Sequence, residues 1–510
     1  TKHKKIKWKG NKEMEKIKER LKAITLEQWH IVVIIAGIIF VSLGAFHSNI
    51  WFDESYSVGL ARHTFGEIWS IGGHDVHPIL YYWMLRIVYL ITGGPIIAYK
   101  IFSVIPSAIL IVLGYTHIRK DFSEKTGFIF SFLSAFLPEM AVYAVEIRMY
   151  SWAILAVTIL AIYAYRLSKE DNAKNWIIFG ISSLASIYLH YYGLMAAGLI
   201  NVILLVYLIV KKRKKGLIFI ISFGIVQALA YLPWLMNFVT QLSNVSNGYW
   251  IGFSFPKTPM ELLSSQLAGY VKSSDYTDLL VPTVLSLELY GYIIYKTYIY
   301  FKEKQELQPF KWSVIVYFAV ILAAVIITVV MKTSILYYRY LFVITGLYIF
   351  AISFILAKEK NKIEFVTILS VIAILGGYNN IKIIKDNYDR TNYEPMKYIE
   401  ENIQEGDTIV FSNLGGGFVA AIHFEDNQVY FYNPENWGVE EAYKAFGPNY
   451  ETCVTKDFAE DCSNRVWVID DINSSLYEEL FENKEYKKVS EKEFYTKYHD
   501  YNYKITLIEK

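Results

Sequence analysis

Residues 29–56 read WHIVVIIAGIIFVSLGAFHSNIWFDESY, an apolar run that ends beside two adjacent acids, Asp53 and Glu54. A helix needs roughly 20 apolar residues to cross a bilayer, and this run comes close to that length. The first 22 residues carry ten Lys or Arg against three Glu, and basic flanks of this kind stay in the cytoplasm. The sequence therefore predicts a first helix that delivers Asp53 and Glu54 to the outer face of a membrane.

The rest of the chain continues this apolar pattern. Of its 510 residues, 54% are hydrophobic and 19% are charged, with a mean hydropathy of +0.27, which is too apolar for an ordinary soluble protein. Twelve apolar stretches lie near residues 29–47, 79–92, 96–118, 127–145, 149–166, 176–190, 194–210, 216–234, 279–301, 312–331, 340–357 and 363–378. They predict a polytopic α-helical membrane protein with about 11–13 transmembrane helices over residues 29–380.

Lys and Arg gather in short clusters between these stretches, which argues against nucleic-acid binding and orients the chain. We expect residues 1–28 to form a cytoplasmic basic segment, either an amphipathic helix on the inner leaflet or a simple orientation signal. Further cytoplasmic clusters are Lys211–Lys215, Lys302–Lys304 and Lys358–Lys362. Counting outward from them places outside the membrane a first loop at 48–78, Glu146–Tyr150, His190–Gly193, a long loop at 235–277 and Ser334–Tyr340.

One apolar stretch too many lies between the first loop and Glu146. Three stretches occur there, whereas two positions on the same side of a membrane require an even number of crossings. One of the three does not span; the stretch at 79–92 is the shortest and contains Arg86.

After Tyr378 the composition becomes polar, and strand-like runs appear at 408–412, 428–432 and 466–469. Residues 384–510 are therefore predicted to form a small α/β domain, which an odd number of crossings would place outside. Both cysteines, Cys453 and Cys462, fall in this domain. A local disulfide and two free thiols are equally consistent with that location.

Five polar clusters map to the outer side of the predicted topology. Each cluster alone is more typical of solvated loops, local ion pairs or interfacial aromatic rings than of a site. Together they indicate a single outward-facing site, because the opposite face carries only the orienting Lys clusters. The clusters are Asp53-Glu54; His74, Asp75 and His77; Glu146, Arg148 and Tyr150; His190 and Tyr191; and Arg339-Tyr340.

These clusters occur within an ordered set of motifs that resembles the GT-C superfamily of membrane glycosyltransferases, near its protein O-mannosyltransferase and aminoarabinose-transferase branch. The resemblance covers about residues 30–380 and departs from the usual pattern at Ile79, where a second Pro is common. In chain order the motifs are Trp51-Phe52-Asp53-Glu54, Asp75-x-His77-Pro78-x-Leu80-Tyr81-Tyr82, Arg148-Met149-Tyr150, His190-Tyr191-Tyr192-Gly193, Tyr231-Leu232-Pro233-Trp234 and Arg339-Tyr340.

The resemblance implies a GT-C fold and transfer of a sugar from a polyprenyl-phosphate donor to a glycan, lipid or protein acceptor outside the membrane. Asp53 takes the position of the catalytic base. Glu54 is the second expected catalytic residue, which could orient the acceptor, assist Asp53 or face away. Arg148 and Arg339, with Tyr340, suit the donor phosphate, because guanidinium binds phosphate bidentately. A single base opposite a charged leaving group favours inversion in one step. The residues expected to bind substrate are His74, Asp75, His77, Glu146, Tyr150, His190 and Tyr191.

Two other interpretations stay open at this level. A flippase or transporter of lipid-linked glycans would also have many helices, although such proteins commonly show repeated halves, and none is apparent here. A polymerase or ligase of surface glycans would share the lipid substrate. The participation of a divalent cation is also open; if one binds, Asp53, Asp75 and His77 are its expected ligands.

Overall fold

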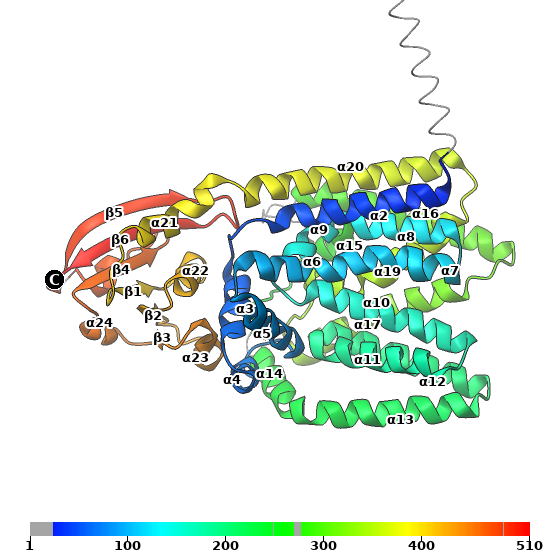
Figure 1. Ribbon diagram of the computed structural model, residues 1–510, viewed down its shortest axis with the longest axis horizontal. Helices are drawn as coiled ribbons and strands as arrows, with labels where there is room; N and C mark the ends of the chain where they lie inside the picture. Colours follow the sequence, from blue (N-terminus) through cyan, green and yellow to red (C-terminus); the bar gives the residue numbers. More distant parts are fainter. Residues whose placement is uncertain (1–23, 248, 270–276, 483) are drawn as a thin grey trace, which may run out of the picture.

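The computed structural model describes residues 24–247, 249–269, 277–482 and 484–510. It has two parts, a long helical bundle and a mixed α/β domain at one end of it (Figure 1). The bundle begins with α2 (Leu26–Ser42) and finishes with α20 (Lys362–Asn387). The predicted architecture, a polytopic helical protein with a small C-terminal sheet domain, is confirmed.

Within the described residues, nine helical segments are long and apolar enough to cross a membrane. They are Leu26–Ala45 with α2; Ile96–Asp121 with α6 (Ile96–Leu113) and α7 (Arg119–Asp121); α10 (Tyr150–Lys169); α12 (Tyr191–Val210); Lys214–Ser246 with α13 (Lys214–Tyr231) and α14 (Leu235–Asn247); Asp278–Lys302 in α16 (Thr277–Lys302); α17 (Gln308–Met331); Tyr338–Ala357 with α18 (Tyr338–Leu341) and α19 (Thr345–Ala357); and α20.

Two further helical segments run through the bundle. Helices α8 (Glu124–Phe136) and α9 (Pro138–Val145) form one apolar path that bends by 63°, because Pro138 starts a new helix immediately after Leu137. The 17-residue helix α11 (Ala173–Leu189) packs against α10 and α12. By length and composition, nine of the described helical segments, or ten with the bent pair, could cross a membrane, and α11 lies beside them in the bundle.

The first loop is largely helical, with α3 (Phe52–Arg62) and α4 (Phe65–Gly72) preceding α5 (Leu80–Thr92). Helix α5 has 13 residues, so it is about 20 Å long, short of the roughly 30 Å hydrocarbon core of a bilayer. It packs against α3 at the end of the bundle nearest the sheet domain. Without α5, two segments that could cross a membrane separate the first loop from Glu146. They are Ile96–Asp121 and the bent pair α8 and α9, and two is the even number that the topology requires.

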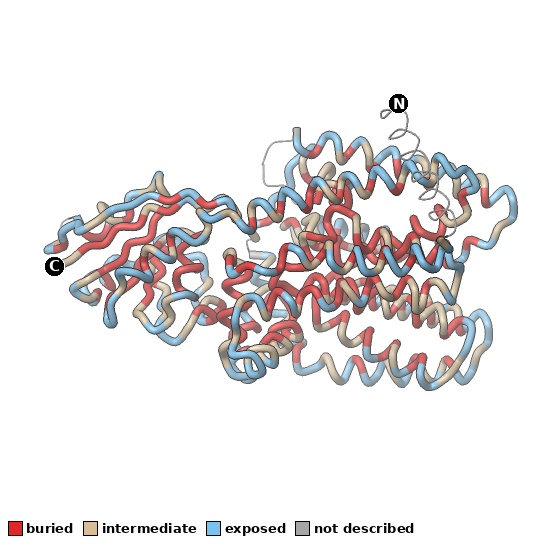
Figure 2. The backbone as a smooth tube through the Cα atoms, turned by 45° about the horizontal axis from the view of Figure 1, so that its top comes forward, coloured by how far each residue is buried: buried red, intermediate tan, exposed pale blue. Residues whose placement is uncertain are grey.

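Many helices turn apolar side chains outward. On α13, Ile218 is 67% exposed and Leu229 is 62% exposed, and Val330 on α17 is 74% exposed. Figure 2 shows exposed backbone along the outer helices and buried backbone inside the bundle and the sheet. Apolar surface of this extent is stable only against lipid or another protein, as expected of membrane-spanning helices.

The last helix continues beyond the predicted end of the membrane part, residue 380, and reaches Asn387. Its polar end is held by the first helix, because the Asn380 side chain donates to the Phe40 carbonyl at 2.8 Å. The side chain of Asn49 likewise donates to the Asn387 carbonyl at 2.9 Å. These contacts explain why α20 continues beyond the end of its apolar sequence.

The C-terminal domain contains one six-stranded sheet in the order β3-β2-β1-β4-β6-β5. Strands β1 to β4 pair in parallel, and β6 pairs antiparallel with both β4 and β5. Both cysteines are buried and free. The strands are β1 (Thr408–Phe411), β2 (Gln428–Tyr432), β3 (Tyr450–Cys453), β4 (Arg465–Asp470), β5 (Lys487–Tyr495) and β6 (Asn502–Glu509), and the helices are α21 (Glu394–Glu400), α22 (Gly416–His423), α23 (Glu440–Tyr443), α24 (Phe458–Asp461) and α25 (Leu476–Leu480).

The sheet domain is packed onto the first loop. Helix α22 contacts α3, where a side chain at Gly59 would meet the Ala445 carbonyl at 2.4 Å. The rings of Phe52 and Phe418 lie edge to face at 5.2 Å. The start of α3 is therefore enclosed between the bundle and the sheet domain.

We expect substitution of Gly376 in α20 to destabilise the bundle. A Cβ there would lie 2.0 Å from the Phe136 carbonyl at the bend between α8 and α9, and overpacking of this kind costs about 1–3 kcal/mol. A Cβ at Gly377 would meet nothing within 4 Å, so Ala there should stabilise the helix by about 0.5–1 kcal/mol. Thermal unfolding of the purified Gly376→Ala and Gly377→Ala variants should shift in opposite directions; equal shifts would contradict this packing.

Candidate active site

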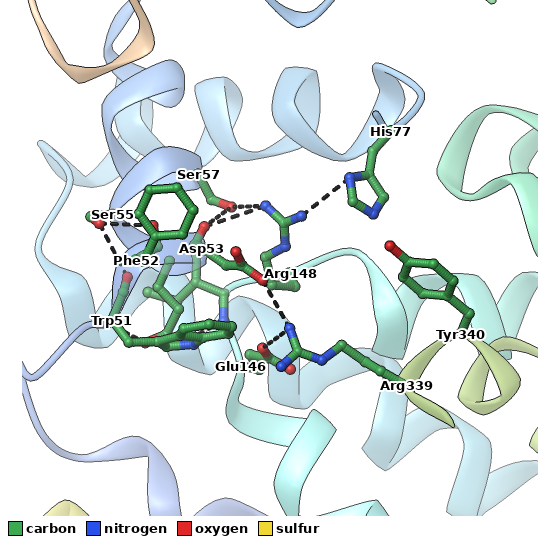
Figure 3. Close-up of polar contacts among 12 residues, drawn as sticks. Trp51, Phe52, Asp53, Ser55, Ser57, His77, Glu146, Arg148, Arg339 and Tyr340 are labelled. Carbon is green, nitrogen blue, oxygen red and sulfur yellow. Dashed lines mark hydrogen bonds and ion pairs between the residues drawn. The ribbon is translucent and has the colours of Figure 1, made fainter. Parts of the chain in front are cut away.

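The predicted polar clusters meet at the end of the bundle beside the sheet domain. The start of α3, the loop before α5, the turn between α9 and α10, and α18 each contribute side chains (Figure 3). The chain forms α3 here because Trp51 is extended and Glu54 folds back to accept its backbone N–H at 3.3 Å. This cap leaves Asp53 in the first turn of the helix.

Asp53 forms an ion pair with Arg339 across 286 positions of sequence, with Nη1 of Arg339 donating to Oδ2 of Asp53 at 2.8 Å. The same guanidinium lies 3.7 Å from Glu146 and 4.8 Å above the Trp51 ring. Nε of Arg339 and Oε2 of Glu146 are buried without a hydrogen-bond partner among the described residues. Each therefore retains bonding capacity for a ligand.

Glu146 is the carboxyl most affected by its surroundings. Burial raises its pKa to about 7, the charges of Glu54 and Asp53 act in the same direction, and the Arg339 guanidinium opposes them. A carboxyl group that titrates near neutrality can hold or release a proton during a reaction. Glu146 thus lies in the site as predicted, as a second acid beside Asp53.

Arg148 binds protein groups on several sides. It donates to the Asp53 carbonyl, Ser57 Oγ and Tyr82 Oη, each at 3.3 Å, and to His77 Nδ1 at 3.2 Å. The guanidinium thereby ties α3 to α5 and to the loop before it. This arrangement makes Arg148 a clamp for the site, and its Nε, like that of Arg339, is buried without a hydrogen-bond partner among the described residues.

The cluster at His74, Asp75 and His77 is only partly brought into the site. Asp75 accepts from Tyr82 Oη at 3.0 Å and lies 3.5 Å from His77 Nδ1. Burial lowers the pKa of His77, so its imidazole is neutral and can accept from Arg148. His74 is exposed, and its ring nitrogen contacts only the Ser70 carbonyl among the hydrogen bonds described, so it stays outside the cluster.

The predicted metal ligands do not converge. Asp53 binds Arg339, while Asp75 and His77 face each other next to Arg148. Within the described ranges, no group of three His, Cys, Asp or Glu side chains could hold a metal ion.

Aromatic rings form one wall of the site. The His190 ring lies 5.4 Å from His77, 5.7 Å from Tyr150 and 4.9 Å from Tyr340. Burial lowers the pKa of His190 well below its usual value, so this wall is uncharged. Tyr340 Oη and Tyr249 Oη are 2.7 Å apart, which brings the long loop against the site.

Tyr191 is the one aromatic residue of the prediction that faces elsewhere. Its hydroxyl bonds to Gln241 of α14, whose amide donates to the His77 carbonyl at 3.2 Å. Tyr191 therefore supports the loop that carries His77 instead of lining the site.

Glu54 points away from Asp53 into the protein. Its side chain is fully buried, and both of its oxygens are taken. Oε1 accepts from Lys100 Nζ at 2.9 Å and from the Ile147 amide at 3.0 Å, and Oε2 accepts from Tyr498 Oη at 2.7 Å. The expectation that Glu54 shares the chemistry does not fit this placement, which makes it a structural anchor.

Lys100, Tyr249 and Tyr498 were not among the predicted site residues. Lys100 gave a signal, since a Lys inside an apolar helix calls for an acidic partner. Tyr249 lies in the long loop at 235–277 that was expected outside the membrane. Tyr498 gave no signal, because it reaches the site from a loop whose path depends on the tertiary fold.

A pocket borders Arg339. Trp51, Glu146 and Arg339 line it on the bundle side, and Lys497 and His499 line it on the side of the C-terminal domain. The paired charges of the site therefore border a space that both parts of the protein enclose.

Comparison with known proteins gives a family-model match to part of the chain and a fold for nearly all of it. The family model of dolichyl-phosphate-mannose-protein mannosyltransferase matches residues 76–245. A search of curated proteins gives no match.

Among solved structures, ArnT from Cupriavidus metallidurans is similar in two states. The apo form aligns with a TM-score of 0.59 at 10% identity, over 94% of this chain and 97% of that one. The form bound to undecaprenyl phosphate aligns with a TM-score of 0.62 at 10% identity, over 94% of this chain and 98% of that one. The likeness includes the C-terminal domain, since it extends over nearly the whole of both chains. The chain therefore has the fold of ArnT, and residues 76–245 within it match the mannosyltransferase family model.

Proposed function

We propose that this protein is a membrane glycosyltransferase of the GT-C superfamily. It moves a sugar from a polyprenyl-phosphate donor to an acceptor hydroxyl on the extracytoplasmic face, by a single displacement with inversion. The observation that carries the proposal is the contact between Asp53 and Arg339. It places a carboxylate suited to accept a proton directly beside a guanidinium suited to bind a phosphate.

The donor class is supported from two directions. The matching family model describes a dolichyl-phosphate-mannose enzyme, and the ArnT structure of similar fold contains undecaprenyl phosphate. In this chain Arg339 supplies the fitting chemistry, because it is enclosed by aromatic rings and its Nε has no protein partner among the described residues. Arg148 holds the loop that carries His77, and its Nε also has no partner among the described residues, so it is the second guanidinium suited to the donor phosphate.

In the proposed reaction, Asp53 accepts the proton and Arg339 stabilises the leaving phosphate. The acceptor oxygen forms a bond to the anomeric carbon while the bond from that carbon to the phosphate oxygen breaks, and the electron pair leaves on the phosphate. The acceptor proton passes to Asp53, and Arg339 stabilises the charge that develops on the polyprenyl phosphate. Phosphate binding also gives Arg339 a second anionic partner, which loosens its hold on Asp53.

The remaining side chains suit substrate binding. Glu146, Tyr150 and His190 border Arg339 and the aromatic wall, and Tyr340 with Tyr249 closes the site toward the long loop. Asp75 and His77 would hold their loop through Arg148. A glycan, lipid or protein acceptor fits equally, so transfer to a polymer end, as in a polymerase or ligase, stays within this proposal.

The outward orientation rests on the charge clusters. Lys211–Lys215, Lys302–Lys304 and Lys358–Lys362 all lie at helix ends remote from the sheet domain (Figure 1). Lys-rich loops stay in the cytoplasm, so the opposite end, with the site and the C-terminal domain, faces outward.

Cysteine labelling tests this orientation. We expect Val489→Cys, on an exposed stretch of β5, to react with an impermeant maleimide added to intact cells. The matched variant Lys360→Cys, in the exposed turn before α20, should react only after permeabilisation. The native thiols are buried and give little background. The reverse pattern would place the site in the cytoplasm.

Replacement of the base should remove transfer. Asp53→Asn keeps the shape of the side chain but cannot take the acceptor proton, and the loss of a general base slows catalysis by about 10²–10⁴-fold. Asp53→Glu retains a carboxylate in a shifted position and should keep part of the activity. Turnover is measured with radiolabelled polyprenyl-phosphate sugars; a rate for Asp53→Asn within threefold of wild type would exclude Asp53 as the base.

Substitution of Arg339 should weaken donor binding and also slow the chemical step, because the phosphate gains charge as the glycosidic bond breaks. Loss of one hydrogen bond to a charged group is worth about 1.5–3 kcal/mol, so Arg339→Ala should lose about tenfold to hundredfold in activity. Arg339→Lys should recover only part, since a point charge replaces a planar fork.

The control for Arg339 is the amount of folded, membrane-inserted protein. If the guanidinium only extended toward lipid headgroups, Lys would serve as well as Arg, and Ala would reduce insertion more than kcat or donor KM. Wild-type kinetics for both variants would remove Arg339 from the site.

A further inference from the structure

The loop between β5 and β6 reaches out of the C-terminal domain and contacts the motif that carries Asp53. His499 stacks on Trp51 with ring centroids 4.4 Å apart and planes 7° apart. The Phe52 amide donates to Tyr501 Oη at 3.1 Å, and Tyr498 Oη donates to Glu54 at 2.7 Å. The loop thus touches the residues on both sides of Asp53.

The contact with Glu54 falls on a wholly buried ion pair. Both side chains of the Glu54–Lys100 pair are 0% exposed, and Tyr498 Oη also lies 3.4 Å from Lys100 Nζ. Buried charges are tolerated only when their bonding capacity is met. Tyr498 therefore completes a network that joins the C-terminal domain to α3 and to α6 inside the bundle.

The loop is built to hold Tyr498 in this place. The backbone amides of Lys497 and Tyr498 both donate to Asn392 Oδ1, at 2.8 and 2.9 Å. His499 and Asp500 then adopt positive φ angles of 55° and 51°, which turn the chain back sharply. A tyrosine presented by such a loop loses little freedom when it binds its partner.

We infer that Tyr498 is a positioning residue for sugar transfer: through Glu54 it fixes the first turn of α3, and so the place of Asp53, which makes the C-terminal domain part of the catalytic site. Successive residues of a helix point about 100° apart. Anchoring Glu54 toward Lys100 therefore directs Asp53 toward Arg339. This inference rests on the proposed role of Asp53 as the base.

The test compares two tyrosines of the same hairpin. Tyr498→Phe removes only the hydroxyl that reaches Glu54, whereas Tyr495→Phe removes a hydroxyl bonded to exposed Glu493 on the surface of β5. A displacement of about 1 Å at a reacting group can cost about 10²-fold in rate. For Tyr498→Phe we expect kcat to fall at least tenfold, with the KM values of donor and acceptor within threefold of wild type, and for Tyr495→Phe no change.

Hydrogen exchange by mass spectrometry on the intact, detergent-solubilised protein gives a second readout that needs no activity. Peptides covering residues 48–58 should exchange faster in Tyr498→Phe and at the wild-type rate in Tyr495→Phe. An unchanged exchange rate, or faster exchange with unchanged kcat, would overturn the inference.

Failure of the proposed function looks different. In that case the wild-type protein itself transfers no sugar from polyprenyl-phosphate donors. The exchange experiment then still decides whether Tyr498 holds the Asp53 motif, and equal exchange in both variants would reject it.

Discussion

The ion pair between Glu54 and Lys100 is fully buried, and four separate parts of the chain supply the groups that stabilise its charges. Helix α3 supplies the carboxylate and α6 the ammonium group, while the Ile147 amide and the Tyr498 hydroxyl fill the remaining positions on the carboxylate. Removing one partner of a buried ion pair typically lowers the stability of a protein by about 3–5 kcal/mol. The folded protein therefore keeps these four segments in contact. The first loop, the bundle, the turn before α10 and the C-terminal domain are thereby fixed at one point.

This buried ion pair explains why the adjacent residues Asp53 and Glu54 have different partners. Glu54 is committed to the interior, and the helical geometry turns Asp53 toward Arg339, where its side chain stays 24% exposed. Arg148 holds the same turn from the other side through the Asp53 carbonyl. In our account the base therefore sits on a rigid helix end, and the partly exposed ion pair beside it is the part of the site that substrate can rearrange.

Much of this could be predicted from sequence, because hydropathy and Lys clusters place distant motifs on one side of a membrane. That reasoning brought Asp53, Glu146 and Arg339 together correctly. It could not predict that Glu54 turns inward or that His74 stays at the surface, since those directions depend on Lys100, Tyr498 and other partners far away in sequence. The last helix runs past residue 380 for a related reason: Asn380 is polar, but its side chain donates to the Phe40 carbonyl. The β5–β6 loop carries no motif, and only the folded domain reveals where it reaches.

The central claim is a single displacement in which Asp53 takes the acceptor proton and no covalent sugar–enzyme bond forms. It is tested most directly by the configuration of the anomeric carbon before and after transfer. A polyprenyl-phosphate sugar of defined configuration is supplied to the purified protein, and the new glycosidic bond, or the sugar released to water before mutarotation, is followed by NMR. The account predicts that the configuration is inverted. A product that retains the configuration of the donor would contradict it.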